Sequence, residues 1–66
     1  MNIRVNNIQK IISSGSSIED LLLLLNHTQN GIAVAINEEI ILKDNWSRST
    51  LNENDTVLLI QATQGG

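Results

Sequence analysis

The chain has 66 residues, which is room for a single domain, and 41% of them are hydrophobic, enough for one compact core and too many for a disordered segment. It contains no cysteine, which excludes disulfides, iron–sulfur clusters and thiol nucleophiles. The net charge is −3 and the four basic residues are scattered, so nucleic-acid binding, which needs clustered Lys and Arg, is disfavoured.

The N-terminal segment predicts a β-hairpin. Residues 2–6 alternate apolar and polar side chains, a pattern typical of a half-buried strand. Asn6-Asn7 is a turn signal because asparagine tolerates the left-handed backbone conformation. We therefore expect residues 8–12 to form the second strand.

A helix is expected to begin after Ser17, whose hydroxyl can cap the free amides of the first turn. Asp20, three residues later, supplies a capping-box partner. Apolar side chains then recur at helical spacing. They predict a buried stripe of Ile18, Leu21, Leu22 and Leu25. Leu23 and Leu24 widen the apolar face, and the helix should end near residues 26–27.

The sequence pattern of the second half of the chain predicts three strands. Residues 32–36 alternate large and small apolar side chains, which favours a central strand with the helix over its larger face. A turn and a short strand over residues 40–42 follow. Residues 43–54 are polar and irregular, and residues 56–62 form the last strand.

This order of elements predicts an α+β fold. A right-handed crossover places the first and last strands side by side and parallel in the middle of the sheet. The result is the β-grasp architecture, a mixed sheet of four to five strands over one main helix. We expect the domain to span residues 1–62 and a flexible tail to occupy residues 63–66.

The chain stops at Gly65-Gly66, which is the most distinctive feature of the sequence. Glycine places no Cβ beside the terminal carboxylate and lets the chain enter a narrow site with unusual dihedral angles. Ordering four tail residues costs about 4–8 kcal/mol, so a partner that captures the tail needs a further docking surface. The alternative interpretation is an ordinary frayed terminus.

The last strand offers such a surface because its side chains are apolar on both faces. We expect Val57 and Leu59 to meet the helix and Leu58 and Ile60 to face outward as a partner interface. The alternative is that residues 43–54 fold over that face. In that case Trp46 could cover it, although we expect Trp46 to anchor the core.

Four stretches, in this order and spacing, carry a resemblance to a known family that runs from Met1 to Gly66. They are residues 3–6, 17–22, 32–41 and 55–60, the last followed by Gly65-Gly66. In these four stretches the chain resembles the ThiS family of sulfur carriers, in the ubiquitin-like β-grasp superfamily. Asn54 stands where the family often has glycine, and asparagine can adopt the left-handed conformation that such a turn requires.

The resemblance implies a reaction cycle in which the chain is a carrier and not an enzyme. An E1-like (ThiF-like) enzyme would use ATP and magnesium to adenylate the Gly66 carboxylate, with Gly65 giving clearance. A cysteine-desulfurase relay would supply sulfur to form a thiocarboxylate, which would pass to a ThiG-like thiazole synthase. The chain itself is expected to bind no cofactor and no metal.

Other functions remain open at this point. The small subunit of molybdopterin synthase, a tRNA-thiolation carrier or a ubiquitin-like modifier would share the Gly-Gly end. A β-grasp interaction module with an inert tail belongs to a different class. An enzyme is disfavoured because no Ser–His–Asp spacing surrounds the single histidine, His27, and no glycine loop could hold phosphate.

The sequence also indicates where the protein works. The longest leucine run, residues 21–25, is too short to span a bilayer. Met1 leads almost directly into the first strand, so no signal or transit peptide is expected. We therefore expect a cytoplasmic protein, or one of the plastid stroma if it is organelle-encoded.

Overall fold

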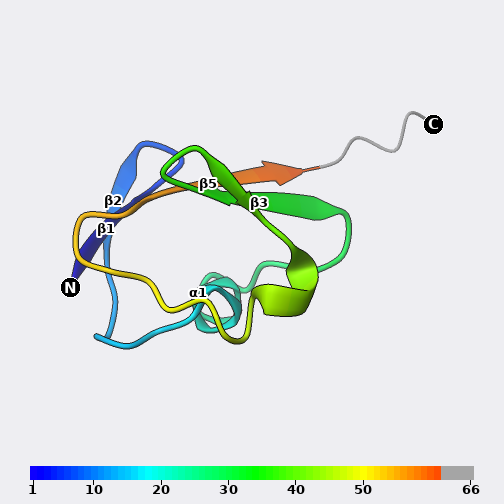
Figure 1. Cartoon of the computed structure of the whole chain (residues 1–66). Coiled ribbons are helices and arrows are strands. Elements are labelled where there is room, and N and C mark those ends of the chain that lie inside the picture. Colours follow the sequence, from blue (N-terminus) through cyan, green and yellow to red (C-terminus); the bar gives the residue numbers. More distant parts are fainter. Residues whose placement is uncertain (62–66) are drawn as a thin grey trace.

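The computed structural model describes residues 1–61, and within them five strands form one mixed sheet over a single α-helix (Figure 1). The elements in chain order are β1 (Asn2–Val5), β2 (Ile8–Ile11), α1 (Ile18–Leu24), β3 (Ile32–Ile36), β4 (Glu39–Ile41), a 3-10 helix (Lys43–Asn45) and β5 (Thr56–Gln61). The strand order is β2-β1-β5-β3-β4. β1 and β5 are parallel, and every other neighbouring pair is antiparallel. The expected β-grasp arrangement is confirmed.

Both hairpins turn through two residues with positive φ. The angles are 49° and 70° at Asn6 and Asn7, and 50° and 73° at Asn37 and Glu38. Two successive left-handed residues make a type I′ turn, whose twist matches that of the flanking strands. Asn54, before β5, also has the expected left-handed conformation, with φ 68°. Glu38 differs from the other four because glutamate has no particular tolerance for this conformation.

The start of α1 is closed by the expected capping box. The backbone N–H of Asp20 donates to Ser17 Oγ (3.1 Å), and the backbone N–H of Ser17 donates to the Asp20 carboxylate (3.0 Å). These reciprocal bonds satisfy two amides that the helix start leaves without partners. The helix then buries Ile18, Leu21 and Leu22, with Leu25 half-buried against the same core.

The helix ends before the leucine run is complete. Asn26 has φ 55°, its N–H donates to the Leu23 carbonyl (3.1 Å), and the N–H of His27 donates to the Leu22 carbonyl (2.9 Å). This pair of bonds is a Schellman motif, which terminates a helix at a left-handed residue. Leu23 and Leu24 are 65% and 63% exposed, because the helical rotation carries them away from the sheet. The part of the apolar face that these two leucines add is therefore exposed, and the buried stripe is the one predicted from Ile18, Leu21, Leu22 and Leu25.

The core lies between the sheet and α1. Its buried members are Ile3, Val5, Ile12, Ile18, Leu21, Leu22, Val34, Trp46, Leu51 and Val57. Trp46 is 2% exposed, and its Nε1 donates to the Ile41 carbonyl (2.9 Å), so it anchors the core as expected. Residues 43–54 are tied to the start of the helix, where the N–H of Leu51 donates to the Ser16 carbonyl (2.8 Å). This segment therefore packs on the helix side of the sheet.

The turn at Asn37-Glu38 generates a stability prediction. Glu38→Gly should stabilise the domain by about 0.5–1 kcal/mol, because it removes the strain of a left-handed glutamate. The only opposing effect is the greater conformational entropy of glycine in the unfolded chain, which is smaller than that strain. Urea denaturation measures the change.

Asn37→Gly is the matched control for that substitution. It should destabilise the domain by about 1–2 kcal/mol, because the Asn37 side chain donates to Asp55 (3.1 Å) and accepts from the backbone N–H of Thr56 (3.0 Å). Equal effects of the two substitutions would contradict the assignment of strain to Glu38.

Candidate functional site

The candidate site is built on β5, the strand that leads to the C-terminal glycines. β5 pairs with β3 from Val57, opposite Ile36, to Gln61, opposite Ile32. The sheet therefore holds the chain up to the last described residue. The predicted reactive residues, Gly65 and Gly66, lie outside the described residues, as does the predicted domain boundary at residue 62.

The other edge of β5 is held partly by a side chain. The register of β1 with β5 ends at Val5, opposite Val57, and the N–H of Asn6 donates to the Val57 carbonyl (2.9 Å). Beyond this point the Asn6 side chain continues the ladder. Its Oδ1 accepts from the N–H of Leu59 (2.8 Å), and its Nδ2 donates to the Leu59 carbonyl (3.4 Å). Sequence analysis identified Asn6 only as a turn residue, because this role depends on a strand about fifty residues away.

The two faces of β5 differ as predicted. Val57 is 1% exposed and Leu59 packs against the core, whereas Leu58 and Ile60 are 47% and 43% exposed. Strand alternation explains the difference, because successive side chains point to opposite faces of a sheet. The predicted orientation of the four residues is therefore confirmed, while the role of Leu58 and Ile60 as a partner interface stays a prediction.

Neighbouring strands extend the apolar surface across the face of the sheet opposite α1, here called the outer face. Ala35 on β3 lies between Ile40 on β4 and Leu58 on β5, and Ala33 lies opposite Ile60. Ile40 is 57% exposed. The outer-face patch consists of Ala33, Ala35, Ile40, Leu58 and Ile60, of which Ala35 is only 5% exposed and lies beneath its larger neighbours. The sequence patterns did not assign Ile40, Ala33 or Ala35 to this surface, although the small size of the two alanines between large residues was an available signal.

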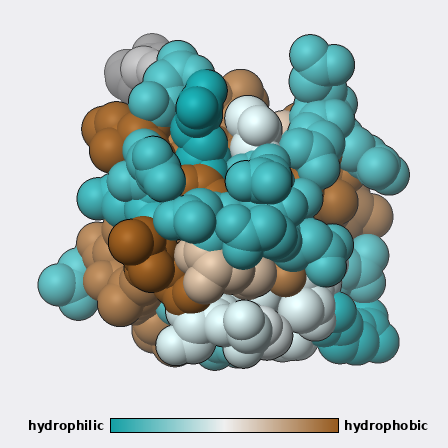
Figure 2. Space-filling model, turned by 90° about the vertical axis from the view of Figure 1, so that its left-hand side faces the viewer, coloured by the Kyte–Doolittle hydropathy of each residue, from teal (hydrophilic) through white to brown (hydrophobic). Residues whose placement is uncertain are grey.

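Residues 43–54 do not cover this patch. Trp46 is buried in the core on the helix side, so the alternative in which it shields Leu58 is wrong. Figure 2 shows the side of the molecule where the N-terminus lies, on which a hydrophilic band crosses the surface and hydrophobic groups lie mostly toward the margins. Large apolar side chains are also exposed elsewhere, at Ile8, Ile11, Leu23, Leu24 and Leu42, so the outer-face patch is distinguished by its continuity across neighbouring strands.

The described residues bring together no catalytic constellation around β5. His27 follows the end of α1, where its Nδ1 lies 3.2 Å from the Thr28 carbonyl oxygen. Within residues 1–61, His, Asp and Glu side chains form no group of three that could hold a metal ion. Over the same range, no helix has the length and apolar character that a bilayer crossing requires.

A five-stranded mixed sheet over one helix, with the first and last strands parallel at its centre, defines a ubiquitin-like β-grasp domain. The sequence model described as the ThiS family matches residues 3–66, and the chain belongs to that family. The sulfur carrier protein ThiS of Escherichia coli strain K12 is 32% identical over 66 residues, which is 100% of both chains.

Solved structures agree with this fold. The crystal structure of the thiamine biosynthesis protein ThiS from Geobacter metallireducens matches with a TM-score of 0.87 at 23% identity, over 100% of both chains. An NMR structure of a thiamine biosynthesis protein from the same organism matches with a TM-score of 0.79 at 23% identity, over 100% of this chain and 88% of that one. At this identity the two structures support the fold alone.

The two faces of β5 generate a folding prediction. Leu58→Glu should leave the domain folded with a stability loss of no more than about 1 kcal/mol, because the new carboxylate reaches water. Val57→Glu should abolish folding, because it buries an unpaired charge in the core. Circular dichroism with thermal unfolding measures both, and loss of folding in Leu58→Glu would contradict the orientation of β5.

Proposed function

We propose that the chain is a sulfur carrier for the thiazole branch of thiamine biosynthesis. The observation that carries the proposal is membership of the ThiS family along almost the whole chain, to the Gly65-Gly66 end. The Escherichia coli relative, aligned over its full length, bears the name sulfur carrier protein. Proteins of this family are small carriers and not enzymes.

The proposed chemistry takes place at the Gly66 carboxylate. A carboxylate is a poor electrophile, so an E1-like adenylating enzyme joins one of its oxygens to the α-phosphorus of ATP and releases pyrophosphate. The outer sulfur of a persulfide on a cysteine-desulfurase relay then attacks the acyl carbon, and AMP leaves with that oxygen. A thiol reduces the acyl disulfide formed in this way, which releases the relay cysteine and leaves a thiocarboxylate on the carrier. The resulting thiocarboxylate donates sulfur to thiazole synthase. Gly65 keeps side-chain bulk away from the acyl carbon.

In this cycle the chain holds and presents the terminus, while its partners supply catalysis. ATP and magnesium belong to the adenylating enzyme, and the chain binds no cofactor of its own. Pairing of β5 on both edges as far as Leu59, and with β3 as far as Gln61, supports the presenting role, because it gives the terminus a fixed base. We assign the protein to the cytoplasm, where a bacterial pathway of this kind would operate.

The outer-face patch is the proposed docking surface for the adenylating enzyme. Leu58 and Ile60 are its members on β5, and Ile40 extends it on β4. Exposed contiguous apolar surface often marks a protein-binding site. Its position on the strand that leads to the glycines also suits a partner that must capture the tail.

An intact-mass measurement tests the carrier function. The chain is incubated with the adenylating enzyme from the same genome, ATP, magnesium, a cysteine desulfurase and cysteine. The expected result is a mass increase equal to the replacement of one oxygen by sulfur. Deletion of Gly66 should abolish the increase.

Transfer to an acceptor separates the thiazole pathway from its alternatives. Thiazole synthase should recover sulfur from the thiocarboxylate form, and molybdopterin synthase should not. An unchanged mass with an adenylating enzyme known to be competent would contradict the carrier function. Sulfur transfer to molybdopterin synthase alone would assign the chain to the molybdopterin pathway.

A charge placed in the outer-face patch tests the docking surface. Leu58→Glu should weaken binding to the adenylating enzyme by at least about 2 kcal/mol, or about 30-fold, because it puts a carboxylate in the centre of an apolar contact. Leu23→Glu is the matched control, since Leu23 is 65% exposed but lies on α1. Isothermal titration calorimetry gives both affinities, and similar losses in the two variants would argue against the patch.

A further inference from the structure

The charges on the outer face differ from those of the chain as a whole. The strand register puts Arg4, Gln9, Thr56 and Leu58 on this face, and among its described strand residues Arg4 is the one charged side chain. The acidic residues lie on the first turn of α1, at the β3–β4 turn, in the 3-10 helix, in the loop before β5, and at Glu39 on β4, which lies opposite Ile36 and so on the helix side of the sheet. The chain is acidic overall, but the one charge among the described strand residues of this face is positive, and the acidic Glu38 borders the face from the β3–β4 turn.

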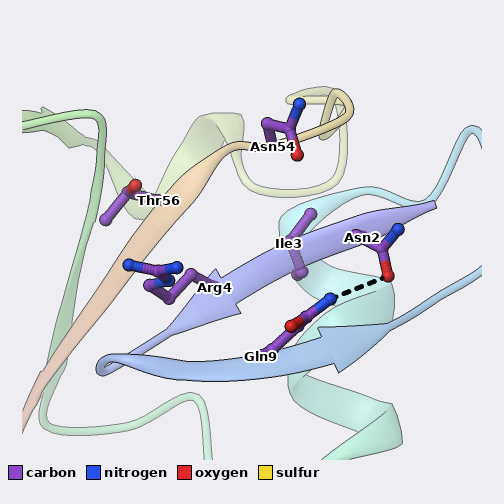
Figure 3. Close-up of a pocket in the computed structure, with 6 residues that line it drawn as sticks. All are labelled: Asn2, Ile3, Arg4, Gln9, Asn54 and Thr56. Carbon is purple, nitrogen blue, oxygen red and sulfur yellow. Dashed lines mark hydrogen bonds between the residues drawn. The ribbon is translucent and has the colours of Figure 1, made fainter.

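Arg4 lies in a polar hollow at the end of β5 farther from the C-terminal glycines. The hollow has a volume of about 330 Å³ and is lined by Asn2, Ile3, Arg4, Gln9, Asn54 and Thr56. Among these residues Figure 3 shows one hydrogen bond, from Gln9 to Asn2 (3.2 Å). The Arg4 guanidinium extends toward Thr56 and bonds to none of the other residues drawn. Its N–H donors are therefore available to a ligand that enters the hollow.

Both carboxylates of the loop before β5 are already engaged in hydrogen bonds. Glu53 accepts two hydrogen bonds from the backbone N–H of Asn2 (3.2 Å each) and one from the Asn2 side chain (3.3 Å). Asp55 accepts from the backbone N–H of Asn52 (2.8 Å) and from Asn37 (3.1 Å). Both carboxylates are engaged by these bonds, and none of the described residues that line the hollow is acidic.

We propose that this hollow receives a carboxylate side chain of the E1-like adenylating enzyme, which pairs with the Arg4 guanidinium. The inference rests on the proposed function and adds a specific polar contact to it. The planar guanidinium fork matches a carboxylate with two parallel hydrogen bonds, so charge and shape both favour an Asp or Glu side chain. Thr56, opposite Arg4, precedes Leu58 on the same face by about 7 Å, so one partner surface contacts both.

The position of Arg4 gives this ion pair a particular role. The patch alone is apolar and non-directional, so it permits a partner to slide or rotate along β5. A bidentate contact near Thr56 fixes the orientation, and Gln61 lies about 17 Å further along the strand. Two separated contacts therefore define the direction in which β5 delivers the terminus to the partner's catalytic site.

Substitution of Arg4, with Lys10 as control, tests the ion pair. Lys10 is also exposed but lies opposite Ile3, so it projects on the helix side of the sheet. Arg4→Gln should weaken binding of the adenylating enzyme about ten- to hundred-fold by isothermal titration calorimetry. Lys10→Gln should stay within about two-fold, as expected of a surface charge with no partner. Arg4→Lys should fall between wild type and Arg4→Gln, because lysine keeps the charge and loses the fork.

Two further measurements distinguish an ion pair from a change in folding. The affinity of Arg4→Gln should fall less steeply than that of wild type as salt is raised. Its KM for carrier-dependent pyrophosphate release should rise while kcat stays unchanged, and its urea midpoint should match that of wild type.

The outcomes separate this inference from the proposed function. Wild-type affinity in Arg4→Gln, or equal losses in Arg4→Gln and Lys10→Gln, would overturn the ion pair while leaving the carrier function intact. A loss seen only with thiazole synthase would overturn the assignment to the adenylating enzyme. Failure of the wild-type chain to be adenylated at all would instead overturn the proposed function.

Discussion

The parallel pairing of β1 with β5 is the contact on which the rest of the structure depends. It joins the first and last strands of the described chain at the centre of the sheet, through Arg4 opposite Thr56 and Val5 opposite Val57. Parallel neighbours need a crossover, and the chain makes it by way of α1. The pairing is short, and the Asn6 side chain lengthens it to Leu59. The strand that leads to the glycines is therefore held on both sides.

The small size of the chain explains why one face of that sheet stays open. One seven-residue helix and the segment over residues 43–54 cover the helix side, where Trp46 and Leu51 complete the core. A domain of this size has no second layer with which to cover the outer face. The exposed Ile40, Leu58 and Ile60 are thus a consequence of the architecture, and in a carrier they coincide with the need for a partner.

Most of the fold could be predicted from the sequence because its signals are local. Apolar alternation located the strands, and the Ser17–Asp20 spacing located the start of α1. The outward orientation of Leu58 also followed from alternation. The role of Asn6 and the hollow around Arg4 could not be predicted in this way. Both depend on the register between strands about fifty residues apart, which no local pattern specifies.

The charged residues are unevenly distributed, so the net charge of the chain does not describe the charge of each of its faces. An acidic protein is expected to favour basic partners, and the carboxylates around α1 and the loops are consistent with such long-range attraction. The outer face would instead favour an acidic group on the partner, because Arg4 is the one charged side chain among the described strand residues of this face. Long-range attraction acts on the whole charge, whereas the hydrogen-bonding fork acts only at contact. A partner with a basic surface and one acidic side chain at the Arg4 hollow would satisfy both, and this combination discriminates more sharply than either feature alone.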